Sequence, residues 1–290
     1  MFSIFSDSAC DLPQDFFQKE GVTLIPLQIE FNDASYTDLV DIQPKEIYDA
    51  LRQGAVVRTS QPSPTTFAEA FRKAALKKEE VLCLTLSSVL SGTHQSAQLA
   101  LQEVLDEYPD FRCELIDTKC ASLGYGILVQ EAVARAKNGS SLAETADDIR
   151  FRMAHMEHLF TVDSLETLMR GGRVSKASAF VGGLLNIKPL LHVENGALVP
   201  LEKTRGNKKW KKRMLELMAE RGDRLQDQVI GISHGDHEEL ALEMKESIQA
   251  QFGCKTFVTS LVGGAIGAHA GPGTLAVFFL NEYKPSLLAE

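Results

Sequence analysis

Short apolar runs alternate with longer segments of helical periodicity in the first half of the chain, and this alternation restricts the fold most strongly. The apolar runs predict strands, at 2–5, 22–31, 81–86 and 113–116. The segments with the 3.6-residue spacing of amphipathic helices lie at 64–78, 92–107 and 123–137. Strand, helix, strand spacing of this kind needs crossover connections, so it predicts a mainly parallel sheet.

A mixed pattern begins near residue 157. Strands are predicted at 159–162, 187–193, 197–203, 229–233, 256–262 and 275–280, and helices at 208–221 and 238–252. Asn195-Gly196 is a strong signal for a two-residue hairpin between the second and third of these strands. The fold class expected is therefore α/β, with two α/β domains. An N-terminal domain at 1–155 has a mainly parallel sheet with crossover helices, and a C-terminal domain at 156–290 has a mixed sheet with helices.

Composition excludes several classes of protein. Lys and Arg number 30 against 39 Asp and Glu, and a net charge of -9 disfavours a nucleic-acid partner. No stretch reaches the roughly 18 apolar residues of a membrane-spanning helix, and the first residues lack the features of a signal peptide. The number of cysteines, five, is odd, and the sequence has no Cys-x-x-Cys pair. Free thiols in a reducing cytoplasm are therefore expected.

Hydroxyl side chains cluster at two places, and the first of these clusters follows a predicted strand. Ser91 and Thr93 precede a long helix, where they are placed to donate to a carboxylate or phosphate, although one of them could simply cap the helix. Thr59 and Ser60 precede two prolines that forbid a helix, so a rigid loop is expected there. The alternative for this second cluster is an ordinary turn with a capping Ser63.

A glycine-rich segment at 263–274 contains five glycines and one titratable residue, His269. Glycines permit close approach of a ligand to the backbone, but the segment lacks the Gly-Lys-Ser/Thr of a P-loop. His269 is either a structural hydrogen-bonding residue or a site residue. The run from His234 to His237 resembles a metal site, but Asp236 fits a helix cap equally well and no metal is expected.

A basic run reverses the sign of the charge locally, around Trp210. Its members are Lys203, Arg205, Lys208, Lys209, Lys211, Lys212 and Arg213. It is either a solvated helix face or a surface for an acidic partner or a phosphate. Arg173, after two glycines, adds another side chain that could face an anion, unless those glycines only end a helix.

Together these segments resemble the DegV family, the fatty-acid-binding subunits of bacterial fatty acid kinase. The matching segments run in order along nearly the whole chain, at 6–8, 10–13, 25–27, 59–63, 86–93, 160–165, 171–175, 185–189, 202–206 and 269–273. The resemblance implies a lipid tunnel at or near the domain interface. It implies that Thr59 and Ser91 hold the carboxylate of a long-chain fatty acid such as palmitate, with His269 near the head group.

The resemblance further implies that the protein is not an enzyme on its own. It would present the bound acid to a separate ATP-dependent kinase subunit, and the acyl phosphate formed would feed phospholipid synthesis. Ser60, Gly92, Arg173 and Arg205 are the candidates for further head-group or partner contacts, and no cofactor is expected. Two alternatives stay open: an acyl hydrolase that uses Ser91 and His269, and a binder of another anionic apolar ligand.

Overall fold

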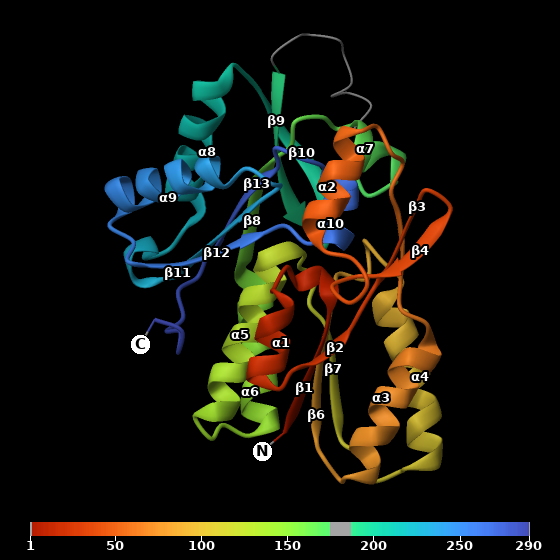
Figure 1. Ribbon diagram of the computed structural model, residues 1–290. Helices are drawn as coiled ribbons and strands as arrows, with labels where there is room; N and C mark the ends of the chain where they lie inside the picture. Colours follow the sequence, from red (N-terminus) through yellow and green to blue (C-terminus); the bar gives the residue numbers. More distant parts are fainter. Residues whose placement is uncertain (1, 175–186, 290) are drawn as a thin grey trace.

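The computed structural model describes residues 2–174 and 187–289 (Figure 1). The strands are β1 (Ser3–Asp7), β2 (Thr23–Ile25), β3 (Gln28–Phe31), β4 (Ala34–Thr37), β5 (Arg58–Ser60), β6 (Val81–Thr85), β7 (Cys113–Asp117), β8 (Met156–Thr161), β9 (Ile187–Glu194), β10 (Ala197–Arg205), β11 (Val229–His234), β12 (Thr256–Leu261) and β13 (Leu275–Leu280). The α-helices are α1 (Gln14–Glu20), α2 (Pro44–Arg52), α3 (Pro64–Leu76), α4 (Thr93–Glu107), α5 (Ser122–Lys137), α6 (Leu142–His155), α7 (Glu166–Arg170), α8 (Asn207–Arg221), α9 (Glu238–Phe252) and α10 (Gly264–Ala270). Short 3₁₀ turns lie at Ser8–Cys10 and Leu225–Asp227.

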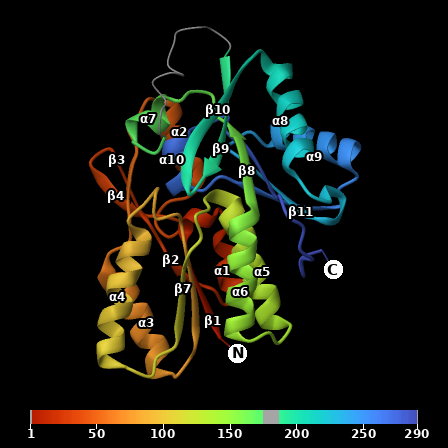
Figure 2. The same ribbon diagram turned by 180° about the vertical axis from the view of Figure 1, so that it is seen from behind.

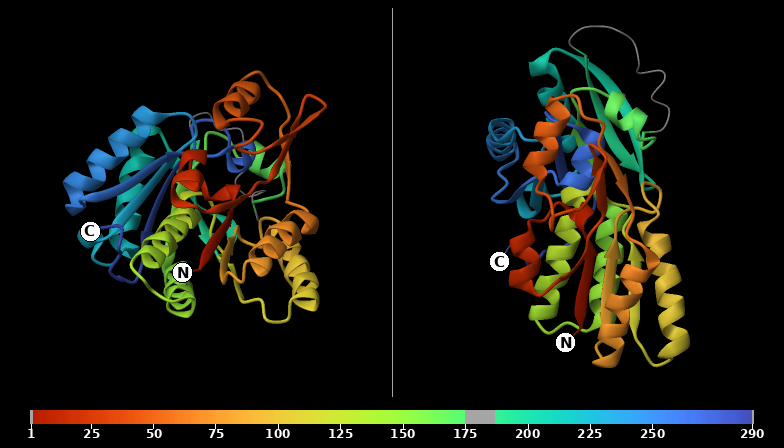
Figure 3. Two further views of the ribbon diagram at one scale, coloured as in Figure 1. Left: turned by 60° about the horizontal axis from the view of Figure 1, so that its bottom comes forward. Right: turned by 45° about the vertical axis from the view of Figure 1, so that its right-hand side comes forward.

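The first main sheet has the order β2-β1-β6-β7, and all its pairs are parallel. Its strand β6 is buried on both faces, because Val81 and Cys83 pack under α3 and α4 while Leu82 and Leu84 pack under α5. Figure 3 shows these helix pairs on opposite sides of the sheet. The predicted parallel sheet with crossover helices is confirmed.

The second main sheet has the order β10-β9-β8-β13-β11-β12 and is mixed, with only β11 and β12 parallel. Leu275, Val277 and Phe279 of β13 face α8 and α9, whereas Ala276 and Phe278 face the other way, toward α5. Helices α8 and α9 therefore cover one face, as Figures 1 and 2 show. The opposite face of the mixed sheet is the inner one, and it faces the part of the molecule that contains the parallel sheet.

The hairpin between β9 and β10 forms as predicted. Asn195 and Gly196 both have positive φ, at 51° and 83°, as a two-residue turn of the I′ type requires. Ala197 pairs with Glu194 directly after the turn. Because β10 is an edge strand, this hairpin forms the border of the second sheet (Figure 2).

Two predicted local structures are wrong. The strand expected at 22–31 is divided between β2 and β3, which belong to different sheets, because Pro26 has no N–H to donate to a ladder. The loop expected at Thr59 and Ser60 is the short strand β5, which pairs antiparallel with β3 in a small sheet of order β4-β3-β5. Pairing with β3 satisfies the backbone there.

Helix α10 occupies the glycine-rich segment, for which no helix was predicted. A Cβ on Gly267 would lie 2.7 Å from the hydroxyl of Tyr48, and one on Gly264 would lie 2.7 Å from Cδ1 of Ile29. These two glycines therefore allow α2 and β3 to pack close to α10. The sequence analysis expected them to allow a ligand to approach the backbone. The division into domains at residue 155 stays a prediction, because the largest apolar core includes residues from both main sheets.

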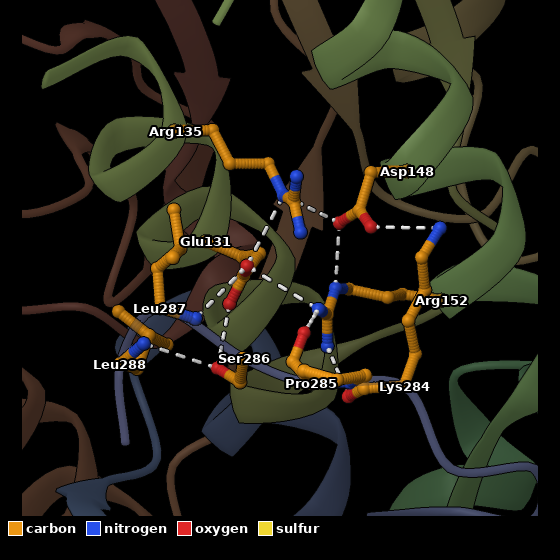
Figure 4. A network of polar contacts seen from close by, with 9 residues as sticks. All are labelled: Glu131, Arg135, Asp148, Arg152, Lys284, Pro285, Ser286, Leu287 and Leu288. Atoms are coloured by element: carbon orange, nitrogen blue, oxygen red, sulfur yellow. Dashed lines mark hydrogen bonds and ion pairs between the residues drawn. The ribbon is translucent and has the colours of Figure 1, made fainter. Parts of the chain in front are cut away.

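The segment after β13 is fastened to α5 and α6 by a buried ionic network (Figure 4). Glu131 is fully buried and contacts Arg135 and Arg152 at 3.1 and 3.3 Å, while Arg152 also pairs with Asp148 at 2.6 Å. Ser286 donates to Glu131 at 2.6 Å, and Arg152 donates to the carbonyl of Pro285. The end of the described chain is thereby held against the parallel-sheet layer.

Candidate functional site

An apolar pocket lies between the carboxyl ends of the parallel strands and the inner face of the mixed sheet. It encloses about 850 Å³ of empty space, part of it open to solvent. The walls are mostly aliphatic and aromatic, and they include Leu27, Leu86, Leu90, Phe160, Leu168, Val193, Leu198, Val262, Ile266 and Phe278. The carboxyl end of a parallel sheet is where α/β proteins commonly bind ligands.

Thr59 and His269 meet at one side of this pocket. The Oγ1 of Thr59 lies 2.7 Å from Nε2 of His269, which joins β5 to α10. A carboxylate only accepts hydrogen bonds, so a Thr59 hydroxyl that donates to one must itself accept from His269. In that arrangement the histidine fixes the direction in which the threonine donates.

Ser91 lines the same pocket, on the turn between β6 and α4. Its Oγ accepts from the backbone N–H of Thr93 at 3.3 Å and lies 2.8 Å from the Thr93 hydroxyl. When Thr93 donates both bonds, the proton of Ser91 is free to point into the pocket. Ser91 is thus hydrogen-bonded just before the helix start, but the N-cap of α4 is Gly92 and has no side-chain cap hydrogen bond, so the capping alternative is not confirmed. Ser91 also lines the pocket.

Asp7 positions the turn that carries Ser91. Its carboxylate accepts from the backbone N–H of Leu86 at 2.7 Å and from that of Ala9 at 3.0 Å. Burial raises the pKa of Asp7 to about 7, against the lowering effect of these two bonds. Asp7 is fully buried and lies outside the pocket lining, so its contribution is to hold the turn.

Arg173 completes the polar side of the pocket. Its guanidinium donates to the carbonyl of Leu90 at 3.1 Å and to that of Gly171. A Cβ on Gly171 would lie 2.3 Å from Nδ1 of His269, so only glycine lets the end of α7 approach the imidazole. Burial and, secondarily, the positive charge of Arg173 lower the pKa of His269 to about 4. The imidazole is therefore neutral at neutral pH.

Three further polar side chains of the lining, those of Ser122, Ser233 and His158, have partners within the protein. Ser122 donates to Asp11 and lies 3.0 Å from the hydroxyl of Ser233. His158 accepts at Nε2 from the N–H of Ala121 at 3.3 Å, and burial lowers its pKa to about 4. Because these side chains are hydrogen-bonded within the protein, this part of the wall can face an apolar chain.

The β9–β10 hairpin forms one wall of the pocket through Val193 and Leu198. Its tip contacts the Ser91 turn, because the hydroxyl of Ser87 donates to the carbonyl of Gly196 at 2.8 Å. A Cβ on Gly196 would lie 2.5 Å from that hydroxyl oxygen. Glycine at this position therefore serves both the turn and the contact between the two main sheets.

The structure places most of the predicted site residues together. Thr59, Ser60, Ser91, Arg173 and His269 all line the apolar pocket. Gly92 lies just outside it, where a Cβ would come within 2.8 Å of the Gln61 side chain. Arg205 ends the edge strand β10, is exposed and does not line the pocket, so it is a candidate only for a surface contact.

The other predicted features have structural explanations. Lys211, Lys212 and Arg213 pair with Glu243, Glu216 and Glu202 respectively, so much of the basic run is neutralised within the chain. The side chain of Lys208 lies outside the described residues, as do Ser175, Leu185 and Asn186 of the matched segments. Asp236 does not cap α9, contrary to one expectation.

Instead Asp236 pairs with Arg52 of α2 at 2.5 Å, while the N-cap of α9 is His237. In residues 2–174 and 187–289, no group of three or more His, Cys, Asp or Glu side chains is placed to hold a metal ion. All five cysteines are free, as predicted. Within the same described ranges, no helix combines the length and apolar character needed to cross a bilayer.

A serine hydrolase would need a base beside its nucleophile. The Nε2 of His269 lies on Thr59, and the polar partner of Ser91 is Thr93. The geometry therefore does not favour the hydrolase alternative. It places two hydroxyl groups, those of Thr59 and Ser91, on the lining of one largely apolar pocket.

The sequence analysis missed three kinds of contributor. Gly171 was considered as a helix end, but the space that His269 needs was not foreseen. Asp7 lies just beyond the strand predicted at 2–5, and nothing in the sequence relates it to Leu86. Arg58 and Arg170, which line a neighbouring pocket with Arg173 and His269, received no role because the sequence separates them widely.

Comparisons with known proteins cover almost the entire chain. A family model described as "Uncharacterised protein, DegV family" matches residues 1–282. A DegV domain-containing protein of Clostridium perfringens is 38% identical over 286 residues, covering 98% of this chain and 98% of that protein. The pocket and all the residues named above that line it therefore lie inside the matched region.

Solved structures match equally broadly. A fatty-acid-binding DegV family protein from Thermus thermophilus has a TM-score of 0.86 and 34% identity, covering 96% of this chain and 98% of that chain. A stearic-acid-binding protein from Eubacterium ventriosum has a TM-score of 0.87 and 27% identity, covering 97% of this chain and 99% of that chain. The α/β fold described above is thus shared with proteins that bind fatty acids.

Proposed function

This chain belongs to the DegV family, and on that premise we propose that it binds a long-chain fatty acid and presents the carboxylate to a separate ATP-dependent kinase subunit. The kinase converts the acid to an acyl phosphate, which feeds phospholipid synthesis. The chain itself carries the substrate and performs no catalysis alone. Palmitate is a representative ligand.

The observation that carries this proposal is the pairing of an apolar pocket with two hydroxyl donors. Thr59 and Ser91 both line the pocket, and each is backed by a second polar group, His269 or Thr93. A carboxylate has two oxygens that accept hydrogen bonds, so it suits such a pair. The aliphatic walls suit the tail.

The energetics agree with this division of roles. Burying one methylene contributes about 0.8 kcal/mol, so a 16-carbon tail offers on the order of 12 kcal/mol before the costs of association. The tail therefore supplies most of the affinity. The head group needs only to be hydrogen-bonded and oriented, which neutral hydroxyls do without neutralising the carboxylate.

The same arrangement suits phosphoryl transfer. A carboxylate oxygen forms the new bond to the γ-phosphorus, the bond from phosphorus to the bridging oxygen breaks, and the nucleoside diphosphate leaves with that oxygen. Catalysis of such a step depends chiefly on positioning and on stabilising charge. The sequence has no P-loop of its own, so the proposal assigns the nucleotide to the kinase subunit.

The direct test is to purify the protein from a bacterial host, extract it with organic solvent and analyse the extract by mass spectrometry. We expect a stoichiometric long-chain fatty acid. A lipid-free protein that also fails to take up added palmitate contradicts the proposal. Competition between labelled palmitate and an isoprenoid acid separates fatty-acid binding from binding of another anionic apolar ligand.

The kinase partnership needs its own test. The palmitate-loaded protein is incubated with ATP and a cognate kinase subunit, and acyl phosphate is trapped with hydroxylamine. Acyl phosphate should form only when both proteins are present. Hydrolysis of acyl esters by this chain alone would instead support the hydrolase alternative with Ser91 and His269.

A further inference from the structure

A buried five-residue turn at the carboxyl end of β1, from Asp7 to Asp11, adjoins the apolar pocket. It contains the 3₁₀ turn Ser8–Cys10, and all five of its residues are buried. Asp7 and Asp11 flank the 3₁₀ turn, and of the five residues only Ala9 lines the pocket. The two carboxylates therefore lie next to the site without forming part of its lining.

Two side chains of this turn bind backbone N–H groups of other segments. Asp7 accepts from the N–H of Leu86 at 2.7 Å, in the segment that leads to Ser91. The Oγ of Ser8 accepts from the N–H of Leu27 at 3.1 Å, directly before β3, and β3 pairs with β5. The turn is thus bonded to the segments that position both hydroxyl groups of the candidate site.

Asp11 makes a third connection, to the helix that carries His269. Its Oδ1 accepts from the backbone N–H of Gly263 at 2.9 Å, although 252 residues separate the two in the chain, and its Oδ2 accepts from the hydroxyl of Ser122. Gly263 is the N-cap of α10, and a Cβ there would lie 2.9 Å from the same Oδ1. Glycine at this position therefore lets the carboxylate reach the start of α10.

Helix α10 is short, so a shift at its start reaches His269. The helix has seven residues, a length of about 10 Å, and His269 is the last but one of them. The hydrogen bond between His269 and Thr59 spans 2.7 Å, and hydrogen bonds are lost beyond about 3.5 Å. A displacement of about 1 Å, transmitted along a rigid helix, would therefore break this contact.

We propose that Asp11 is a positioning residue for the head-group site, because by holding the start of α10 it keeps His269 within hydrogen-bond distance of the Thr59 hydroxyl. The inference rests on the proposed function, in which that hydroxyl donates to the ligand's carboxylate. Asp11 does not line the pocket, so it acts through Gly263 and His269. A role confined to the stability of the fold would weaken the binding of every ligand alike. A positioning role weakens chiefly the binding of ligands with a carboxylate.

The hydrogen bonds of Asp11, and not its full negative charge, are what this role requires. Burial raises the pKa of Asp11 to about 7, against the lowering effect of its bonds from Ser122 and Gly263, so the group is partly protonated at neutral pH. Asparagine keeps an oxygen that accepts from Gly263 and an amide that donates to Ser122. It also tolerates the left-handed φ of 56°. Asp11→Asn should therefore preserve the position of α10, whereas Asp11→Ala removes both bonds.

The test compares palmitate with hexadecanol, a ligand of the same chain length with an uncharged head group. The full chain is delipidated, and the affinity for each ligand is measured by displacement of a fluorescent fatty acid. Asp11→Ala should bind palmitate about tenfold more weakly, because a hydrogen bond to a charged group is lost. Its affinity for hexadecanol should fall much less. Asp11→Asn should bind both ligands as the wild type does.

Asp33→Ala is the matched control, because Asp33 is exposed in the turn between β3 and β4 and has a φ of 58°, close to that of Asp11. This variant removes a carboxylate from the same backbone conformation and should leave both affinities unchanged. If Asp11→Ala does not fold, Gly263→Ala replaces it. The φ of -64° at Gly263 suits alanine, but the new Cβ would press on the carboxylate of Asp11, so the same selective loss is expected.

The imidazole of His269 gives a second readout, from its nitrogen chemical shifts in nuclear magnetic resonance. When Thr59 accepts from Nε2, the wild type holds its proton on that nitrogen. Asp11→Ala should show a mixture of the two neutral tautomers, because the partner that selects one of them is displaced. An unchanged tautomer in this variant would mean that His269 has not moved, and it overturns the inference.

The outcomes separate the inference from the proposed function. Equal losses of palmitate and hexadecanol affinity in Asp11→Ala indicate a structural role only and overturn the inference, while the proposed function survives. Full palmitate affinity in Asp11→Ala, or a loss in Asp11→Asn as large as that in Asp11→Ala, overturns it as well. Failure of the wild type to bind palmitate overturns the proposed function itself.

Discussion

The hydroxyl oxygen of Thr59 lies 2.7 Å from Nε2 of His269, although 210 residues separate the two in the chain. One belongs to the small sheet β4-β3-β5 and the other to α10, which follows β12 of the mixed sheet. The contact therefore ties the two parts of the chain together at the wall that the apolar pocket and its neighbouring pocket share. Loss of this hydrogen bond should therefore lower both the affinity for the ligand and the stability of the fold.

Replacing Thr59 by valine should weaken palmitate binding about tenfold, because the shape is kept while a hydrogen bond to a charged carboxylate is lost. The half-buried His269 would also lose its partner. Thr167→Val is the control, since Thr167 lines only the neighbouring pocket. It makes the same chemical change and should leave palmitate affinity unchanged. Equal affinities in Thr59→Val and the wild type would remove Thr59 from the proposed carboxylate site.

Replacing Gly171 by alanine should displace the imidazole of His269, because the new Cβ would lie 2.3 Å from Nδ1. We expect a marked loss of palmitate affinity, measured by fluorescence displacement. Gly172→Ala is the comparison: its φ of 69° strains alanine by about 1 kcal/mol, but the space around it is open. That variant should lose stability and keep its affinity. The reverse order of affinities would contradict the role given to Gly171.

The sequence predicted the sheets far better than the small structures between them. Strands such as β6 have five consecutive buried residues, and their apolar pattern is visible without any tertiary information. The strand β5 has only three residues, Arg58 to Ser60, and exists because β3 lies beside it. Helix α10 consists largely of glycine and alanine, so its helical form depends on packing against Tyr48 and Ile29.

The candidate site likewise has a part that the sequence predicted and a part that it did not. Thr59, Ser91 and His269 could be proposed from local motifs and a family resemblance, and the structure places all three on one pocket. The neighbouring pocket could not be predicted, because Arg58 and Arg170 come from segments more than a hundred residues apart. No local pattern distinguishes these two side chains from those of ordinary surface arginines.

Replacing Glu131 by glutamine should destabilise the protein by about 3–5 kcal/mol, because it removes one of the two buried carboxylates that pair with Arg135 and Arg152. Glu131 is fully buried and Arg152 nearly so, and both anchor the segment from Lys284 to Leu288 (Figure 4). Burial opposes the charge of Asp148, yet ionic contacts from Lys284 and Arg152 hold its pKa below the usual range. Urea unfolding measures the loss in free energy.

The control for this network is Asp147→Asn. Asp147 is exposed and pairs with Arg150 at 3.0 Å on the surface of α6. Exposed pairs contribute little, so less than about 1 kcal/mol should be lost. If the two variants lost equal free energy, the buried network would have no special part in holding the C-terminal segment.

The neutrality of His269 gives a prediction about pH. Burial and, secondarily, Arg173 lower its pKa to about 4 from an ordinary value of 6.5, so the folded protein binds this proton less readily than the unfolded chain. Its contribution to stability is therefore complete above pH 6.5 and is lost as the pH falls toward 4. Asp7 and Asp11, whose pKa values burial raises to about 7, act in the opposite direction over an overlapping range.

Because these groups have opposite effects, the contribution of His269 is measured as the difference in unfolding free energy between a His269 variant and the wild type at each pH. His269→Asn should flatten the rise in unfolding free energy between pH 4.5 and 6 by at most about 1.4 kcal/mol per pH unit relative to wild type. Arg173→Gln should raise the pKa of His269 in a nuclear magnetic resonance titration, because it removes a nearby positive charge. An imidazole that titrates near 6.5 in the wild type would show that His269 is hydrated, and the directed donation from Thr59 would then lose its basis.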